Sequence, residues 1–343
     1  LITLADLEQY QAKLRQPLEG HFRGFTALTV PPPSSGGVAL LEMLNVLEPL
    51  DLGAPNSFDS MHLLTETMRR AYADRAAYLG DADFVAVPVK HLISSEYAAK
   101  LREQILTSKP EAPVQAGLAM TWRESSQTTH FSVVDAEGNA VANTYTLNGG
   151  YGSGVTVEGA GFLLNDEMDD FAAKPGQPNM FGLVQGEANS IQPRKRPLSS
   201  MTPTIVLRDS GPVGAALTSP EGAQQAAPLQ PRILTPVLVL GSPGGGTIIN
   251  TVLQVLLNAL VFKMDAREAV TSPRFHHQWM PDELVVEDWG FSADTLEKLR
   301  QAGYRISSRR GKIGECQAIT IDPKTGWRFG AADPRGDGRA VGY

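Results

Sequence analysis

The chain has 343 residues, of which 42% are hydrophobic and 20% charged, so it can form one large or two modest folded domains with a buried core. Its net charge of -7, without a Lys/Arg run interleaved with aromatics, gives nucleic-acid binding little support. No stretch approaches the roughly eighteen apolar residues of a membrane span, and the single cysteine, Cys316, excludes an internal disulfide and a cysteine-rich metal site.

The first part of the sequence alternates turn residues with helical patterns. A Pro/Ser/Gly-rich turn at 31–37 precedes an apolar segment, 38–47, that suits a buried helix, and its Gly36-Gly37 pair lets backbones approach closely. Apolar residues three or four apart predict a second helix over 61–79, whose apolar stripe we assign to the core. A third helix is expected at 96–106.

Two further features concern the boundaries of folded segments. Residues 108–127 hold turn formers and small polar residues with little periodicity, which predicts a linker or mobile loop. The first residues have neither the pattern of a signal peptide nor an initiator methionine, so we expect the chain to be part of a longer protein.

After this segment the pattern changes to short strands, beginning with a strong hairpin signal. Two alternating segments, 131–134 and 140–145, flank a turn at 135–139. Folding the hairpin about Glu137 places Thr128 opposite Thr146, at a cross-strand distance of roughly 5 Å.

The rest of the chain predicts an α+β class with sheets sandwiched by helices. Residues 209–232 are rich in Ala, Pro, Gln and Gly without periodicity, which indicates an exposed insertion. We expect further strands at 204–207, 237–240, 284–287 and 318–321, and helices at 248–262 and 292–302.

Few residues point to chemistry on their own pattern. The glycine-rich turn at 241–246 follows a strand and precedes a helix, so its amides could bind an anion or form an oxyanion hole, but it lacks the Lys-Ser/Thr of a phosphate loop. None of the six histidines has metal-ligand spacing. By themselves, the acidic cluster at 165–170 and the Ser199-Ser200 pair are most simply a solvated loop and a turn.

The segment Gln127-Thr128-Thr129-His130-Phe131-Ser132-Val133-Val134-Asp135 resembles the self-cleavage junction of the γ-glutamyltranspeptidases, also called glutathione hydrolases. The resemblance covers nearly the whole chain. Its other motifs lie at 31–37, 71–81, 143–148, 163–178, 196–205, 241–245, 274–286 and 333–335.

This resemblance implies that the precursor cuts itself between Gln127 and Thr128. The freed α-amine of Thr128 then acts as general base for its own hydroxyl, which is sensible because an α-amino group has a pKa of about 7.7 to 8.0. Thr146 corresponds to the threonine that orients the nucleophile, and Gly244 and Gly245 to the glycines of the oxyanion hole.

The resemblance also assigns the substrate contacts. Asn148, Glu167 and Asp170 would hold the α-amino group of a γ-glutamyl moiety, and Ser199 and Ser200 would donate to its α-carboxylate. A γ-glutamyl-enzyme would pass its acyl group to water, an amino acid or a peptide, with a γ-glutamyl compound such as glutathione as substrate and no metal or other cofactor.

At the level of organisation, the resemblance implies a four-layer αββα sandwich of the N-terminal-nucleophile hydrolases. Residues 1–127 would be the tail of the large subunit and 128–343 the small subunit of a heterodimer made from one precursor. The family's bacterial members are commonly periplasmic or secreted, so we expect the same location here.

Three departures from the family pattern qualify these expectations. The arginine that pairs with the substrate carboxylate lies in a region upstream of this sequence, and the insertion at 209–232 is unusual. Phe181 stands where many bacterial members have a lid tyrosine, which predicts looser access to the site. Two alternatives therefore stay open: action on another amide, as by a cephalosporin acylase or a poly-γ-glutamate depolymerase, or a catalytically silent fragment.

Overall fold

The computed structural model describes residues 3–107, 128–212, 232–309 and 312–343. The predicted linker at 108–127, with Gln127, lies outside these residues, and so does most of the predicted insertion. The described part is a mixed helix and sheet structure, which confirms the predicted α+β class.

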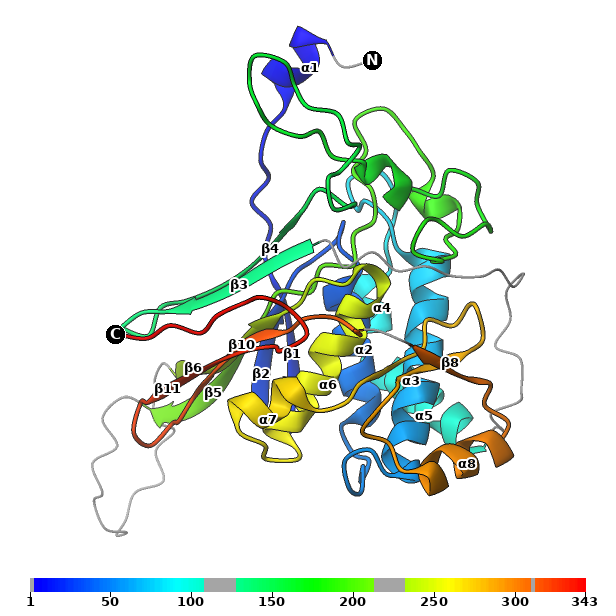
Figure 1. Ribbon diagram of the computed structural model, residues 1–343, viewed down its shortest axis with the longest axis vertical. Coiled ribbons are helices and arrows are strands. Elements are labelled where there is room, and N and C mark those ends of the chain that lie inside the picture. Colours follow the sequence, from blue (N-terminus) through cyan, green and yellow to red (C-terminus); the bar gives the residue numbers. More distant parts are fainter. Residues whose placement is uncertain (1–2, 108–127, 213–231, 310–311) are drawn as a thin grey trace, which may run out of the picture.

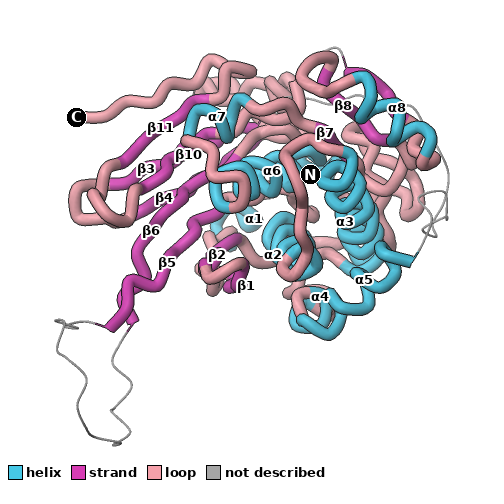
Figure 2. The backbone as a smooth tube through the Cα atoms, turned by 90° about the horizontal axis from the view of Figure 1, so that it is seen from below, coloured by secondary structure: helices cyan, strands magenta, loops and turns pink. Residues whose placement is uncertain are grey.

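A six-stranded antiparallel sheet lies beside the main helices (Figures 1 and 2). Strands from the beginning, middle and end of the chain meet in it, so the sheet depends on long-range pairing. Its strand order is β1 (Leu18–Phe22), β2 (Phe25–Thr29), β5 (Thr204–Pro212), β6 (Arg232–Gly241), β10 (Gln317–Ile321) and β11 (Arg328–Ala332).

The prediction of an irregular insertion at 209–232 is wrong at both of its ends. β5 continues through Asp209 to Pro212, and Pro212 pairs with Arg232 at the start of β6. The register shifts between Asp209 and Pro212, which is how a sheet accommodates Gly and Pro near a strand end. The antiparallel ladder therefore overrides the poor strand propensity of this segment.

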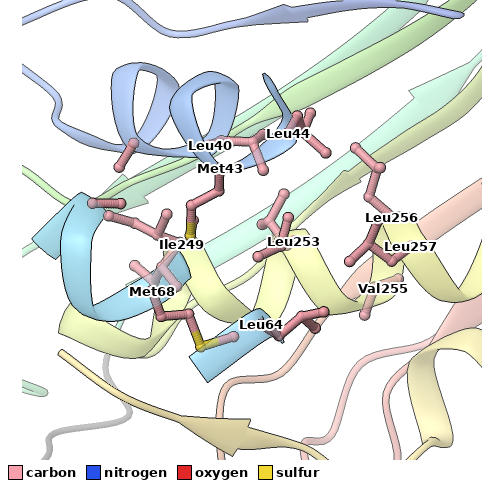
Figure 3. Packing of buried hydrophobic residues seen from close by; sticks show 14 of the residues in the cluster. Leu40, Met43, Leu44, Leu64, Met68, Ile249, Leu253, Val255, Leu256 and Leu257 are labelled. Atoms are coloured by element: carbon pink, nitrogen blue, oxygen red, sulfur yellow. The ribbon is translucent and has the colours of Figure 1, made fainter. Parts of the chain in front are cut away.

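Helices cover one face of the sheet and build the main core (Figure 3). The predicted helices are confirmed as α2 (Gly36–Leu47), α3 (Phe58–Tyr78), α5 (Ser95–Thr107), α6 (Ile248–Leu260) and α8 (Ala293–Gln301). Shorter helices are α1 (Leu4–Gln9), α4 (Val89–Leu92) and α7 (Ala266–Thr271). Figure 3 shows Leu40 and Met43 of α2, Met68 of α3 and Leu253 of α6 interdigitating, the dense packing expected of a protein interior.

The predicted hairpin lies against the opposite face of the sheet. It consists of β3 (Thr128–Val134) and β4 (Ala140–Thr146), and Thr128 pairs with Thr146, as its turn predicted. On β6, Leu240 points into the helix-side core, so the next residue, Gly241, faces the other way. A Cβ on Gly241 would lie 2.2 Å from the His130 ring, so the hairpin packs on that face.

A small third sheet completes the fold with β7 (Phe275–His276), β8 (Leu284–Glu287) and β9 (Ile306–Arg309). The buried histidines beside it have structural partners. His276 Nδ1 lies 2.8 Å from Asn250 Nδ2, and His277 Nε2 lies 3.2 Å from an Asp282 carboxylate oxygen. In the described part of the chain, no group of three or more His, Cys, Asp or Glu side chains could hold a metal ion, and no helix there could span a membrane.

Candidate active site

The paired threonines lie at the open end of the hairpin, where β3 begins and β4 ends. The Thr128 hydroxyl donates to Thr146 Oγ1 at 3.3 Å, and the backbone N–H of Asn148 donates to the same oxygen at 2.8 Å. Asn148 adopts a left-handed conformation with φ of 72°, which turns the chain back over the hairpin end. The Thr146 hydroxyl is thus anchored by the backbone and can hold Thr128 in one orientation.

The glycine loop leads from β6 into α6, as predicted, through a short 3-10 helix, η3 (Gly245–Thr247). Gly244 and Gly245 have φ values of 133° and 52°, a region that favours glycine. The Thr247 N–H and hydroxyl both donate to the Gly244 carbonyl, at 3.0 Å and 2.8 Å, and fix the turn. The buried Tyr72 hydroxyl also donates to the Gly246 carbonyl, so the loop is held from α3 as well.

One small pocket brings most of the predicted site residues together. It is lined by Thr128, Thr146, Asn148, Asp170, Ser199, Ser200 and Gly245, together with Phe181, Leu183, Met201 and Ile248. Gly244 and Glu167 do not line it, although each adjoins a residue that does: Gly244 precedes Gly245, and Glu167 hydrogen-bonds Asp170.

The pocket is small, and the expectation of looser access at Phe181 stays a prediction. Its free volume is about 20 Å³, room for a water molecule but not for a glutamyl group. Phe181 is buried, and its ring lies where a Cβ on Gly245 would be only 2.7 Å away. The Phe181 ring packs into the core and forms part of the pocket wall.

Thr128 also borders a second, larger cavity of about 630 Å³. This cavity lies between β3, β10 and the chain near residues 337–341, and Thr128 is the residue that it shares with the small pocket. The Thr128 side chain therefore has space on two sides.

The acidic residues lie on a single 3-10 turn, η1 (Glu167–Asp170), in which side chains three apart share one side. Burial, reinforced by the charge of Glu167, raises the pKa of Asp170 to about 8. Burial, together with the charge of Asp166, raises the pKa of Glu167 to about 7. An ammonium group placed beside this pair would stabilise both ionised carboxylates.

The serine pair is held by the Pro/Ser/Gly-rich turn that precedes α2, a contact that the sequence did not reveal. Ser35 N–H donates to the Ser199 carbonyl at 2.8 Å, Ser199 N–H donates to the Pro33 carbonyl at 3.1 Å, and the Ser34 hydroxyl donates to the Met201 carbonyl at 2.6 Å. The close approach predicted for Gly36-Gly37 is confirmed, because a Cβ on Gly36 would lie 2.3 Å from the Met201 carbonyl oxygen.

This contact predicts the effect of Gly36→Ala. The added methyl group would lie 2.2 Å from the Thr202 hydroxyl oxygen and 2.3 Å from the Met201 carbonyl oxygen. It should therefore push residues 199–202 outward, raise KM for a substrate that binds at the serine pair and lower the melting temperature. Gly24→Ala is a control for the added methyl group, because nothing lies within 4 Å of its Cβ position. At a φ of 82° the alanine is strained, but this strain arises in a loop far from the pocket. An unchanged KM in Gly36→Ala would show that the turn does not set the serine positions.

Sequence reasoning also missed Arg75 of α3, which is buried and donates to the hydroxyl of Ser200. The sequence did contain an indication that Arg75 is buried, since it lies three residues after Tyr72 and seven after Met68, on the apolar stripe of the helix.

With this geometry established, comparison with known proteins identifies the family. The family model described as Gamma-glutamyltranspeptidase matches residues 1–234 and 228–343. The chain belongs to this family. A γ-glutamyltranspeptidase relative, the glutathione hydrolase proenzyme of Escherichia coli K12, is 44% identical over all of this chain and 55% of its own length. The Acylase ACY 1 proenzyme of a Pseudomonas species, strain SE83, is 34% identical over 99% of this chain and 54% of its own length.

Solved structures agree with this membership. A mutant γ-glutamyltranspeptidase of Helicobacter pylori matches with 47% identity and a TM-score of 0.52, over 61% of this chain and 100% of that one. A cephalosporin acylase of Bacillus halodurans matches with a TM-score of 0.77 over 100% of this chain and 55% of its own, and at 23% identity this likeness concerns the fold alone. The chain spans about half the length of the curated relatives that it matches.

Proposed function

We propose that the complete protein is a self-processing γ-glutamyltransferase and glutathione hydrolase with Thr128 as its nucleophile. The observation that carries this proposal is the composition of the small pocket. Beside the Thr128 hydroxyl it places an acidic residue that suits an ammonium group and two serines that suit a carboxylate. In a γ-glutamyl compound the α-carbon carries both the ammonium group and the carboxylate, and the side chain on that carbon ends in the scissile γ-carbonyl.

In the proposed reaction, the Thr128 hydroxyl attacks the γ-carbonyl while the free α-amine of Thr128 accepts its proton. The amides of Gly244 and Gly245 would stabilise the oxyanion, and the amine of the leaving group takes the proton as the amide bond breaks. Water or an acceptor amine then attacks the ester, which releases glutamate or a new γ-glutamyl amide. The larger cavity next to Thr128 offers space for the leaving group and the acceptor.

The same hydroxyl would first process the precursor. Its attack on the Gln127 carbonyl converts the peptide bond into an ester and frees the α-amine, and water then hydrolyses the ester. The division into 1–127 and 128–343, joined as a heterodimer, follows from this step. Residues 128–343 make up slightly more than three fifths of the sequence, close to the 61% of it that matches the whole of the solved Helicobacter pylori chain.

The four-layer αββα arrangement is part of this proposal. Helices, the six-stranded sheet and the hairpin supply three successive layers, and the outward face of the hairpin is largely apolar. Phe131 and Val133 of β3 and Val141 and Tyr145 of β4 are exposed on it. A surface of this kind is normally covered, and a further layer from the rest of the protein would cover it.

A comparison of two chromogenic anilides and a γ-linked glutamate polymer tests the substrate assignment, and it requires the protein together with its upstream region. We expect turnover of the γ-glutamyl anilide, and far less of a glutaryl anilide, which lacks the ammonium group that Asp170 and Glu167 would bind. Preference for the glutaryl compound would favour an acylase, whereas release of glutamate only from a γ-linked polymer would favour a depolymerase. No turnover of any amide by correctly cut protein would favour a silent fragment.

The role of the upstream region and the location of the protein are further parts of the proposal. The isolated 343-residue chain should be weak or inactive, because a substrate carboxylate would then be desolvated against Ser199 and Ser200 without the family's arginine. Full activity of this chain alone would contradict that.

The periplasmic or secreted location stays a prediction, which fractionation of the source cells would test.

A further inference from the structure

Arg75 lies directly behind the serine pair, inside the protein. It is 1% exposed, its Nε donates to Ser35 Oγ at 2.9 Å, and its Nη2 donates to Ser200 Oγ at 3.1 Å. Through these two bonds one guanidinium group reaches both the turn before α2 and a hydroxyl of the pocket wall.

The chemistry of the guanidinium group fixes the direction of these bonds. Arginine can only donate, so both serine oxygens accept and each must place its own proton elsewhere. The Ser35 hydroxyl donates to the Ser199 carbonyl at 2.7 Å. Among the described residues the Ser200 hydroxyl has no acceptor, and Ser200 lines the pocket. Its proton is therefore free to be donated to a group in the pocket.

The charge of Arg75 is also uncompensated at close range. In the described part of the chain no carboxylate lies within ion-pair distance of it, and burial lowers its pKa, an effect that Tyr72 and then the charge of Asp170 only partly oppose. A buried cation without a paired anion is costly. An anion bound at Ser200 would lie one hydrogen bond away from this charge and would offset part of the cost.

We propose that Arg75 is a positioning residue that acts through Ser200, orienting and polarising its hydroxyl as a donor to the substrate α-carboxylate. The inference rests on the proposed function. It assigns to the described chain a positive charge for carboxylate recognition, in addition to the arginine expected upstream. Arg75 would thereby contribute to the preference for γ-glutamyl groups over acyl groups that lack an α-carboxylate.

Arg75→Gln in the complete enzyme tests this with two substrates, γ-glutamyl p-nitroanilide and 4-aminobutyryl p-nitroanilide, which differ only in the α-carboxylate. A hydrogen-bonded charged contact corresponds to about a 10- to 150-fold effect. We expect kcat/KM for the γ-glutamyl compound to fall by about 10-fold or more, mainly through KM, and the value for the 4-aminobutyryl compound to change by less than about 3-fold. Arg75→Lys, which keeps a buried cation, should restore part of the loss.

Arg70→Gln is a matched control, since it removes another buried guanidinium from the same helix. The Arg70 guanidinium is paired with Glu66 at 2.7 Å, and Arg70 does not line the pocket. It should affect both substrates equally. In a Ser200→Ala background, Arg75→Gln should cause little further loss of preference, because the two residues act as one unit. Arg75→Lys, which keeps the buried cation, keeps the test informative if Arg75→Gln alone folds poorly.

The outcomes separate this inference from the proposed function. A wild-type enzyme that turns over the two compounds equally would overturn the proposed substrate class. A wild-type enzyme that prefers the γ-glutamyl compound, and keeps its full preference in Arg75→Gln, would overturn only the role of Arg75. An equal fall on both substrates would show that Arg75 has a merely structural role.

Discussion

Thr128→Ala should leave the complete precursor as one uncut and inactive chain. The reason is that one oxygen atom is assigned two reactions, attack on the Gln127 carbonyl and then attack on substrate. The structure holds that oxygen 3.3 Å from Thr146 Oγ1, at the border of two cavities. In the wild-type precursor we expect scission between Gln127 and Thr128, giving a fragment that begins Thr-Thr-His-Phe. Intact-mass analysis with N-terminal sequencing measures both results.

Two variants serve as controls for this prediction. Thr128→Ser should still cut, more slowly or with altered turnover, because it keeps the hydroxyl and the amine but loses the methyl group that restricts χ1. Thr129→Ala should cut normally, since the next side chain along β3 is exposed and points to the opposite face of the hairpin. An active enzyme whose chain stays whole, or is cut elsewhere, would mean that the nucleophile has been misassigned.

The part of the site that the sequence predicted without a family resemblance is the pairing of Thr128 with Thr146. It was predictable because a hairpin is local: five turn residues set the register, and each strand alternates in the ordinary way. Likewise α6 and β8 are largely apolar segments with clear ends, and the structure places them at nearly the predicted residues.

The elements that the sequence did not predict depend on distant contacts. β1 contains Glu19, Gly20 and His21, a poor strand pattern, yet a Cβ on Gly20 would lie 2.5 Å from a methyl carbon of Leu41. The glycine is there because α2 packs closely on the strand, which no local pattern shows. Similarly, Arg75 and Ser200 are 125 residues apart, so the hydrogen bond between them could come only from the folded structure.

The other strong effect is expected for Asp170→Asn, which should lower kcat/KM for the γ-glutamyl anilide by about 10- to 150-fold. Losing a charge-assisted hydrogen bond to the substrate ammonium costs about 1.5 to 3 kcal/mol, and the loss should appear mainly in substrate capture. Glu158→Gln, which neutralises an exposed carboxylate, is the control and should leave kcat/KM unchanged. An unchanged value in Asp170→Asn would remove Asp170 from the site.

The raised pKa of Asp170 adds a pH dependence with a definite sign. In the free enzyme this carboxyl group ionises only near pH 8, so wild-type kcat/KM should rise with pH through that region. The Thr128 α-amine has a pKa of about 7.7 to 8.0 and contributes to the same rise, so Asp170→Asn should make the rise shallower without abolishing it. Because the folded-state pKa lies above the ordinary value of 3.8, the protonated form favours the fold, and stability falls as pH rises from about 4 to about 8. Asparagine does not titrate. Asp170→Asn should therefore melt at a higher temperature than wild type at pH 7 and lose that advantage at pH 3, whereas a lower melting temperature at pH 7 would contradict the raised pKa.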